Sequence, residues 1–306
     1  MSVTAVALVI AAAIAHASWN IIAHSASRSG MPFLWWGSVG SALLWAGAIP
    51  FTGGLGTAAM PDILLGVGVS SVLHVAYMLV LQRGYAHGEL STVYATARGT
   101  GPTLTVLFAV IALGERPSAL ALGGVGLVLA GVIAFGLISR SNSTGLGAPK
   151  IRGGDISRGR KRLDPSLTYG LLTGAAIAAY TVWDAYTVNE LGMAPVAFMV
   201  GCSLAEVPFF TVAMLRRGRR VAVRDLRAEL RLQWRRMAAF SLLSPLSYVL
   251  VLTAFTMAPV ALVAPMREVS VVLIGLYGAW RFRESRPVLR IVAALVVVAG
   301  VVLIGQ

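Results

Sequence analysis

Long apolar runs separated by short polar turns dominate this sequence, and about ten of them are long enough to cross a lipid bilayer. A transmembrane helix needs roughly 20 predominantly apolar residues to cross about 30 Å of hydrocarbon. The predicted spans are 4–24, 33–51, 62–82, 90–113, 118–139, 166–188, 195–215, 237–257, 259–280 and 288–305. The pattern therefore predicts an all-α integral membrane protein with ten transmembrane helices.

The apolar runs form two copies of one unit. A shift of 169 positions (267 − 98) places Arg98 on Arg267 and Glu115 on Glu284, with two glycines following at the same offset in each copy. One offset thus matches an arginine inside an apolar run, a Glu after that run and two following glycines. This agreement indicates an internal repeat.

The repeat divides the chain into three parts. Residues 1–139 and 166–306 each contain five predicted spans, and residues 140–165, rich in Gly, Ser and basic residues, predict a flexible linker. Because each repeat has an odd number of spans, the second copy inserts upside down relative to the first. The sequence thus predicts two inverted five-helix repeats, a plan used by many transporters.

Composition supports membrane insertion. The 306-residue chain is 57% hydrophobic and 12% charged, and its mean hydropathy of +0.80 lies outside the usual range of soluble globular proteins. The net charge of +13 does not indicate a nucleic-acid partner, because the basic residues lie in short loops between apolar runs. Cys202 is the only cysteine, which excludes a disulfide framework and a cysteine metal site. We expect neither a cofactor nor a metal.

The basic residues also predict an orientation. Almost all of the 25 Lys and Arg follow the odd-numbered spans, whereas the loops on the opposite face contain only Arg116. By the positive-inside rule, both termini should face outward. No basic residue precedes Arg28, so the first apolar run is interpreted as a retained helix and not as a signal peptide.

Two regions remain open to alternative interpretations. Residues 216–236 are dense in Arg and contain Leu226, Leu230 and Leu232, so they form either an amphipathic helix on an anionic membrane surface or a solvated basic loop. The fifth and tenth spans are rich in Gly and Ala, which favours close helix packing or a homodimer contact.

Five charged residues lie well inside the predicted spans, where insertion costs about 2.5–3.5 kcal/mol each and usually indicates a cavity or pathway. They are Arg98, Asp184, Glu206, Arg267 and Glu268. The two arginines either line a substrate cavity or hold the repeats together by salt bridges. Three acids and two bases leave one acid to carry a proton, and Asp184 and Glu268 are the proton-coupling candidates. Glu206 has no repeat counterpart and is not included in the predicted site.

Polar and aromatic residues recur at helical spacing beside these charges. Residues three or four positions apart share a helix face, as do His16 and Asn20 in the first span and Tyr94 and Arg98 in the fourth. Gly and Pro next to Arg98 and Arg267 predict interruptions of these two helices. The predicted cavity residues are His16, Trp19, Asn20, His74, Tyr77, Tyr94, Arg98, Tyr180, Trp183, Asp184, Tyr248, Arg267 and Glu268.

Two motifs carry a family resemblance. His-Ala-Ser-Trp-Asn begins at His16, and Leu-Gly-Glu-Arg-Pro begins at Leu113 before a Gly- and Ala-rich helix; the second repeat departs from the latter as Phe-Arg-Glu-Ser from Phe282. With ten short spans in two repeats, the chain resembles an EamA-type member of the drug/metabolite transporter superfamily over nearly its whole length. The resemblance implies a central cavity, alternating access, export of small metabolites, amino acids or drugs, and cytoplasmic termini, which is opposite to the charge count.

We therefore expect a multi-pass protein of the cytoplasmic (inner) membrane that acts as a secondary transporter, in the direction of export, for a small polar or amphipathic metabolite. In this hypothesis Arg98 and Arg267 attract an anionic group, and Asp184 or Glu268 takes up a coupling proton. The alternative is a flippase for a lipid or its headgroup, or a membrane partner without transport activity. An enzyme is not expected, because the four His residues form no metal-binding His-x-x-x-His pair with a neighbouring acid.

Overall fold

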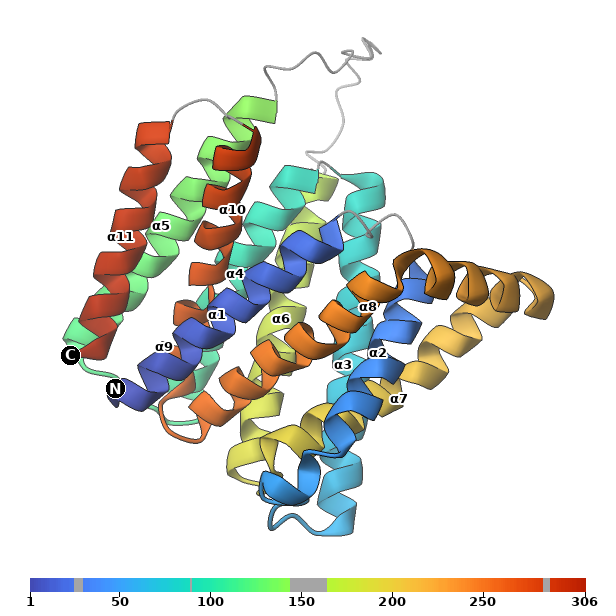
Figure 1. Cartoon of the computed structure of the whole chain (residues 1–306). Helices are drawn as coiled ribbons and strands as arrows, with labels where there is room; N and C mark the ends of the chain where they lie inside the picture. The colour runs from blue at the N-terminus through green and yellow to red at the C-terminus, as the bar shows by residue number, and fades with distance from the viewer. Residues whose placement is uncertain (25–29, 89, 144–163, 283–286) are drawn as a thin grey trace, which may run out of the picture.

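The computed structural model describes residues 1–24, 30–88, 90–143, 164–282 and 287–306, and these ranges form an all-α fold without a named strand (Figure 1). The helices are α1 (Val3–His24), α2 (Met31–Ala46), the short 3₁₀ helix η2 (Ile49–Phe51), α3 (Met60–His87), α4 (Leu90–Ile111), α5 (Ala119–Ser143), α6 (Pro165–Asn189), α7 (Pro195–Leu215), α8 (Arg219–Phe255), α9 (Val260–Arg267), α10 (Val269–Phe282) and α11 (Pro287–Gly305). Both termini lie at the same end of the molecule.

Each apolar run predicted as a span contains a helix, with three differences. The second run ends its α-helix at Ala46, and a 3₁₀ turn follows. The ninth run is divided into α9 and α10 by a turn at Glu268. The basic segment that was open to two interpretations is neither a separate helix nor a loop, because α8 runs without interruption from Arg219 through the eighth span.

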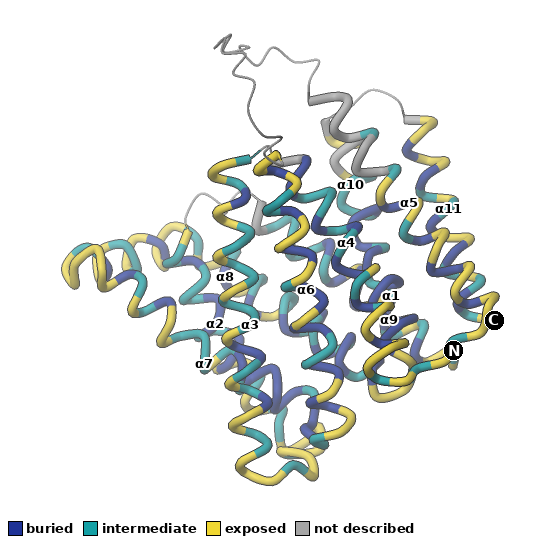
Figure 2. The backbone as a smooth tube through the Cα atoms, turned by 180° about the vertical axis from the view of Figure 1, so that it is seen from behind, coloured by how far each residue is buried: buried dark blue, intermediate teal, exposed yellow. Residues whose placement is uncertain are grey.

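The helices define a membrane-embedded protein. Among the described residues, six segments are long and apolar enough to cross a bilayer, namely α1, α3, α7, α8, the α9–α10 segment Val260–Tyr277 and α11, and α5 contains a shorter apolar stretch. Large apolar side chains are exposed on the outer faces of these helices, including Leu64 and Val72 of α3 and Val298 and Val302 of α11 (Figure 2). Such surfaces suit contact with lipid.

Small residues bring several helix pairs close together. A Cβ added to Gly124 of α5 would meet the carbonyl oxygen of Gly300 in α11, and one added to Gly174 of α6 would meet Thr100 of α4. The glycines at the α5–α11 contact are therefore used for packing within the chain. A homodimer stays a prediction.

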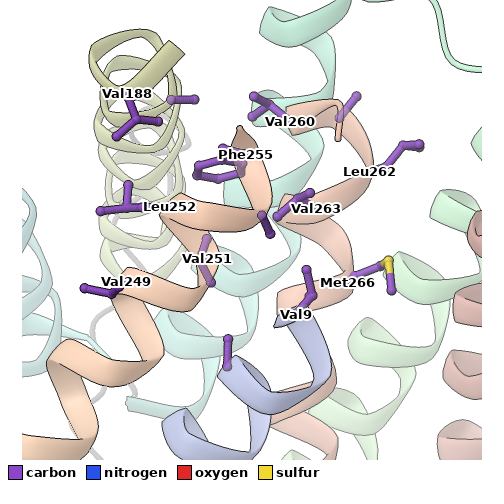
Figure 3. Packing of buried hydrophobic residues seen from close by; sticks show 14 of the residues in the cluster. Val9, Val188, Val249, Val251, Leu252, Phe255, Val260, Leu262, Val263 and Met266 are labelled. Carbon is purple, nitrogen blue, oxygen red and sulfur yellow. The ribbon is translucent and has the colours of Figure 1, made fainter. Parts of the chain in front are cut away.

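The apolar core gathers where α8 leads into α9. Leu252 of α8 and Val260, Val263 and Met266 of α9 are almost completely buried and belong to one cluster with Val9 of α1 (Figure 3). Because α9 is surrounded by protein on all sides, its last residue, Arg267, is held firmly at the inner end of this core.

Candidate functional site

A cavity of about 420 Å³ lies among α1, α2, α3, α4, α6, α7, α8 and α9. Ten of the thirteen predicted site residues line it: His16, Trp19, Asn20, His74, Tyr77, Tyr94, Arg98, Tyr180, Tyr248 and Arg267. Its volume falls within the range of about 300–1,000 Å³ that is usual for small-molecule sites. The predicted polar faces of separate spans thus converge on one space.

The two arginines of this cavity have different partners. The Arg98 guanidinium pairs with Glu268, with Nη1 3.3 Å from Oε1 and 3.4 Å from Oε2, and lies 5.3 Å from the centre of the Tyr94 ring. Arg267 donates to the hydroxyl of Tyr180 at 3.4 Å and has no ion-pair partner among the described residues. Arg98 is therefore neutralised by its partner, whereas Arg267 gives the cavity wall a positive charge.

The backbone differs beside the two arginines. We predicted an interruption in both helices, but α4 continues as one helix past Pro102. Pro102 has no N–H to donate to the Arg98 carbonyl, yet the remaining hydrogen bonds keep the helix intact. The second helix does break: Arg267 ends α9, and the Glu268 N–H donates to the Pro265 carbonyl at 3.0 Å in a tight turn before α10.

Asp184 lies behind the cavity wall and does not line it. Its Oδ1 accepts a hydrogen bond from the Ser70 hydroxyl at 2.6 Å, and its Oδ2 accepts one from the Tyr248 hydroxyl at 2.7 Å. The carboxylate is 1% exposed, and His74 Nε2 is 4.0 Å from Oδ2. His74 and Tyr248 both line the cavity, so they separate this buried acid from the space in which a solute would bind.

The hydrogen bonds of His74 determine its tautomer. Its Nδ1 is 2.9 Å from the carbonyl oxygen of Ser70, which can only accept, so Nδ1 carries a hydrogen. The ring stacks on Tyr180 with centroids 4.2 Å apart. Nε2 therefore faces Asp184 as an acceptor when the ring is neutral and as a donor when it is protonated.

Helix α1 contributes a polar edge with unsatisfied groups. Asn20 Nδ2 donates to the His16 carbonyl at 2.8 Å, and the Trp19 ring lies edge-on between His16 and Phe240. In the part of the chain that the structure describes, neither His16 Nε2 nor Trp19 Nε1 has a hydrogen-bond partner, although both atoms are buried. Each unsatisfied group costs about 1–3 kcal/mol, which a rearrangement that supplies a partner would recover.

The prediction missed the wall formed by α2 and α7. Glu206 lines the cavity and accepts a hydrogen bond from the Ser38 hydroxyl at 3.1 Å. Ser38 and Ser41 come from α2, and Ser203 comes from α7 beside Glu206. Helical spacing was the available signal, because Ser203 and Glu206 are three positions apart on one face. Glu206 has no repeat counterpart in the sequence, but a residue needs none to line this cavity.

Two predicted positions have roles away from the cavity. Trp183 donates its Nε1–H to the Gly66 carbonyl at 3.0 Å, so it joins α6 to α3 outside the cavity lining. Glu115, which the repeat singles out at the end of the fourth predicted span, accepts with its carboxylate from the backbone N–H groups of Val260 and Ala261 at 2.7 and 2.9 Å. It therefore caps α9. Its predicted repeat counterpart, Glu284, lies outside the described residues, as does most of the predicted linker.

Comparison with known proteins identifies the fold without a function. The sequence matches no protein-family model, and no curated protein matches it. A solved structure described in the words "Crystal structure of protein" is similar to 99% of this chain and covers 96% of its own chain, with a TM-score of 0.65 and 15% sequence identity. This similarity shows a shared fold alone. The class that fold and hydropathy define is an all-α, membrane-embedded protein.

Proposed function

We propose that this protein is a secondary transporter that moves a small polar or amphipathic metabolite across the cytoplasmic membrane by alternating access, in the direction of export that the family resemblance implies. The observation that carries the proposal is the cavity itself. Charged and hydrogen-bonding side chains from eight helices face one space inside an otherwise apolar bundle. A charged side chain at membrane depth costs insertion free energy, so such residues are rare and usually mark a pathway or a ligand site.

The pairing of helices supports an arrangement as ten spans in two inverted repeats, with α9 and α10 as one broken span. In this arrangement α1 corresponds to α6, α2 to α7, α3 to α8, α4 to α9–α10 and α5 to α11. If each helix is replaced by its counterpart, the observed helix contacts map onto one another. The contact of α1 with α8 corresponds to that of α6 with α3, and the contact of α2 with α8 corresponds to that of α7 with α3. The α2–α7 and α5–α11 contacts each join a helix to its own counterpart. A cavity at the interface of two such repeats is the usual substrate position.

The Arg267 side of the cavity suits an anionic group of a substrate, whereas the carboxylate of Glu206 lies on the α7 wall. Arg267 provides the positive charge that Glu268 does not neutralise, because Glu268 pairs with Arg98. Tyrosine rings from α3, α4, α6 and α8 supply apolar area with hydroxyl groups at its edges. A small amphipathic solute whose anionic group reaches Arg267 would match this lining.

Asp184 is the better of the two proton-coupling candidates. Glu268 is already held in an ion pair with the Arg98 guanidinium. The neighbours of Asp184 are two hydroxyl groups and the imidazole of His74, and none of them carries a permanent charge. We propose that a proton passes between the cavity and Asp184 through His74, and that this transfer is coupled to the exchange between inward- and outward-open states.

The test uses proteoliposomes that contain a pH-sensitive dye and are challenged with pools of amino acids, amines, organic acids and sugar derivatives. We expect one pool to drive proton flux with the wild-type protein. Asp184→Asn should abolish that flux and retain solute binding, whereas Asp62→Asn, which changes an acid outside the cavity lining, should behave as wild type.

Two outcomes would contradict the proposal. Unchanged proton flux in Asp184→Asn would exclude this residue as the coupling site. Absence of flux from every pool with folded wild-type protein, together with binding of lipid headgroups, would favour the flippase instead.

A further inference from the structure

Helix α8 is longer than a membrane crossing requires, and the additional turns are at its N-terminal end. At about 1.5 Å per residue its 37 residues extend over roughly 55 Å, whereas the hydrocarbon core of a bilayer is about 30 Å thick. Its first turns project from the bundle together with the end of α7 (Figures 1 and 2). The excess length is the basic segment, so its charged side chains lie at or beyond the membrane surface.

Five arginines of this segment form a single stripe. Arg220, Arg224, Arg227, Arg231 and Arg235 are spaced three or four positions apart and are all exposed. At about 100° per residue they fall within a sector of about 80° around the helix. A hollow of about 700 Å³ follows four of them. We call these five residues the arginine stripe.

Little negative charge within the protein compensates the arginine stripe. Among the described residues, its one ion pair joins Arg224 to Asp225 at 3.0 Å, and the Arg224 side chain is still 75% exposed. Arg235 lies 5.4 Å from the ring centre of Trp234. The guanidinium groups therefore face outward with most of their hydrogen-bonding capacity available.

The opposite face of the segment is fixed to the protein. Trp36 of α2 donates its Nε1–H to the Leu226 carbonyl at 3.0 Å. Ala222 and Glu229 of the same segment are buried. The orientation of the stripe is thus set by packing, and an incoming ligand would meet arginines that are already in place.

One border of the stripe is apolar. Val223, Leu230 and Trp234 occupy the adjoining sector and are 41%, 41% and 56% exposed. A basic face beside exposed apolar residues, with a Trp near the membrane-spanning part, is typical of a helix that lies in the headgroup region. The basic and apolar faces together favour a lipid surface over a purely aqueous anionic partner.

We infer that the arginine stripe of α8 is a binding site for anionic phospholipid headgroups of the surrounding bilayer. The guanidinium groups bind headgroup phosphates by paired N–H donation, and Val223, Leu230 and Trp234 contact the acyl boundary. This site is separate from the cavity, and its existence does not depend on which solute, if any, the protein carries.

The experiment measures retention of phosphatidylglycerol by the full-length protein in detergent, with native mass spectrometry and with phosphatidylcholine as the reference lipid. The variant R224Q/R227Q/R231Q removes the centre of the stripe, and R216Q/R217Q/R236Q removes the same charge elsewhere on the α7–α8 hairpin. We expect the stripe variant to lose roughly 100-fold in phosphatidylglycerol affinity, since each of the three arginines near an anionic surface contributes about a fivefold effect. The control variant should lose less than about tenfold.

Each outcome bears on the inference. Equal losses in the two variants would show a response to total charge and would overturn a localised site. Stripe-dependent binding of a single-stranded oligonucleotide, without preference for phosphatidylglycerol over phosphatidylcholine, would overturn the choice of ligand. Since five of the six arginines are exposed and Arg236 bonds only to Gln233 of its own helix, circular dichroism should find both variants folded. As a check without substitutions, phosphatidylglycerol binding by the wild-type protein should weaken as salt is raised, and an unchanged affinity would contradict the inference.

Discussion

Helices α4 and α9–α10 carry corresponding arginines, but the two positions differ in backbone and in charge. Arg98 lies within a continuous helix and is followed by Gly99, whereas Arg267 ends a helix and is followed by Glu268. The two positions together contain two arginines and one acid. That acid pairs with Arg98 of α4 and leaves Arg267 with a tyrosine hydroxyl. The two arginines therefore differ in their partners: Arg98 joins α4 to the turn between α9 and α10 by an ion pair, whereas Arg267 has no acidic partner among the described residues.

The largest expected effect is on stability, from Arg98→Gln. This change leaves Glu268, whose side chain is 4% exposed, without its cation, and breaking a buried ion pair costs about 3 kcal/mol or more of unfolding free energy. Chemical unfolding in detergent, monitored by circular dichroism, would measure the loss. The double variant Arg98→Gln/Glu268→Gln should recover most of it.

Arg267→Gln is the matched control for that experiment, because it removes an arginine that has no acidic partner among the described residues. We expect it to change the unfolding free energy by less than about 1 kcal/mol. Equal destabilisation by Arg98→Gln and Arg267→Gln would contradict the division of roles between the two residues.

The next largest effect concerns solute binding. If Arg267 binds the anionic group of the substrate, Arg267→Gln removes a charge-assisted hydrogen bond worth about 1.5–3 kcal/mol, so affinity should fall roughly 10- to 100-fold. The measurement is titration of the purified variant with the solute found in the proteoliposome assay. Arg267→Lys, which keeps the charge but not the planar donor group, should lose less. An unchanged affinity in Arg267→Gln would remove Arg267 from the substrate site.

Much of this architecture could be predicted from the sequence, because apolar runs of membrane length leave the backbone few alternatives to a helix. Charged residues within those runs also pointed to the cavity, since such residues are tolerated only where protein or water surrounds them, and Arg98 and Arg267 both line it. Periodicity within single helices was sufficient to find the faces that carry His16, Tyr94 and Tyr180, all of which line the cavity.

The choice of partners could not be predicted, since it depends on how helices far apart in the sequence are placed. Arg267 is next to Glu268 in the sequence, yet Glu268 pairs with Arg98, which is 170 residues away. Nothing in the sequence favours this distant partner over the adjacent one. Asp184 and Glu206 were equally visible as buried acids, yet Glu206 lines the cavity and Asp184 lies behind it. The unbroken α4 shows a further limit, because Pro102 removes one hydrogen bond without deciding whether neighbouring turns still hold the helix together.

The smallest expected effect is a loss of stability from Glu115→Gln, at the contact that holds the start of α9. The Glu115 carboxylate accepts from the N–H groups of Val260 and Ala261 with its two oxygens, and so connects the end of the fourth span to the start of α9. Glu115→Gln keeps the size of the side chain but retains one acceptor oxygen and no charge, so unfolding free energy should fall by about 1 kcal/mol. Glu190→Gln, at an exposed position after α6, is the control and should change stability by less than about 0.5 kcal/mol. Equal values for the two variants would mean that α9 is positioned by its apolar contacts alone, and that the break beside Arg267 needs no support from the other half of the chain.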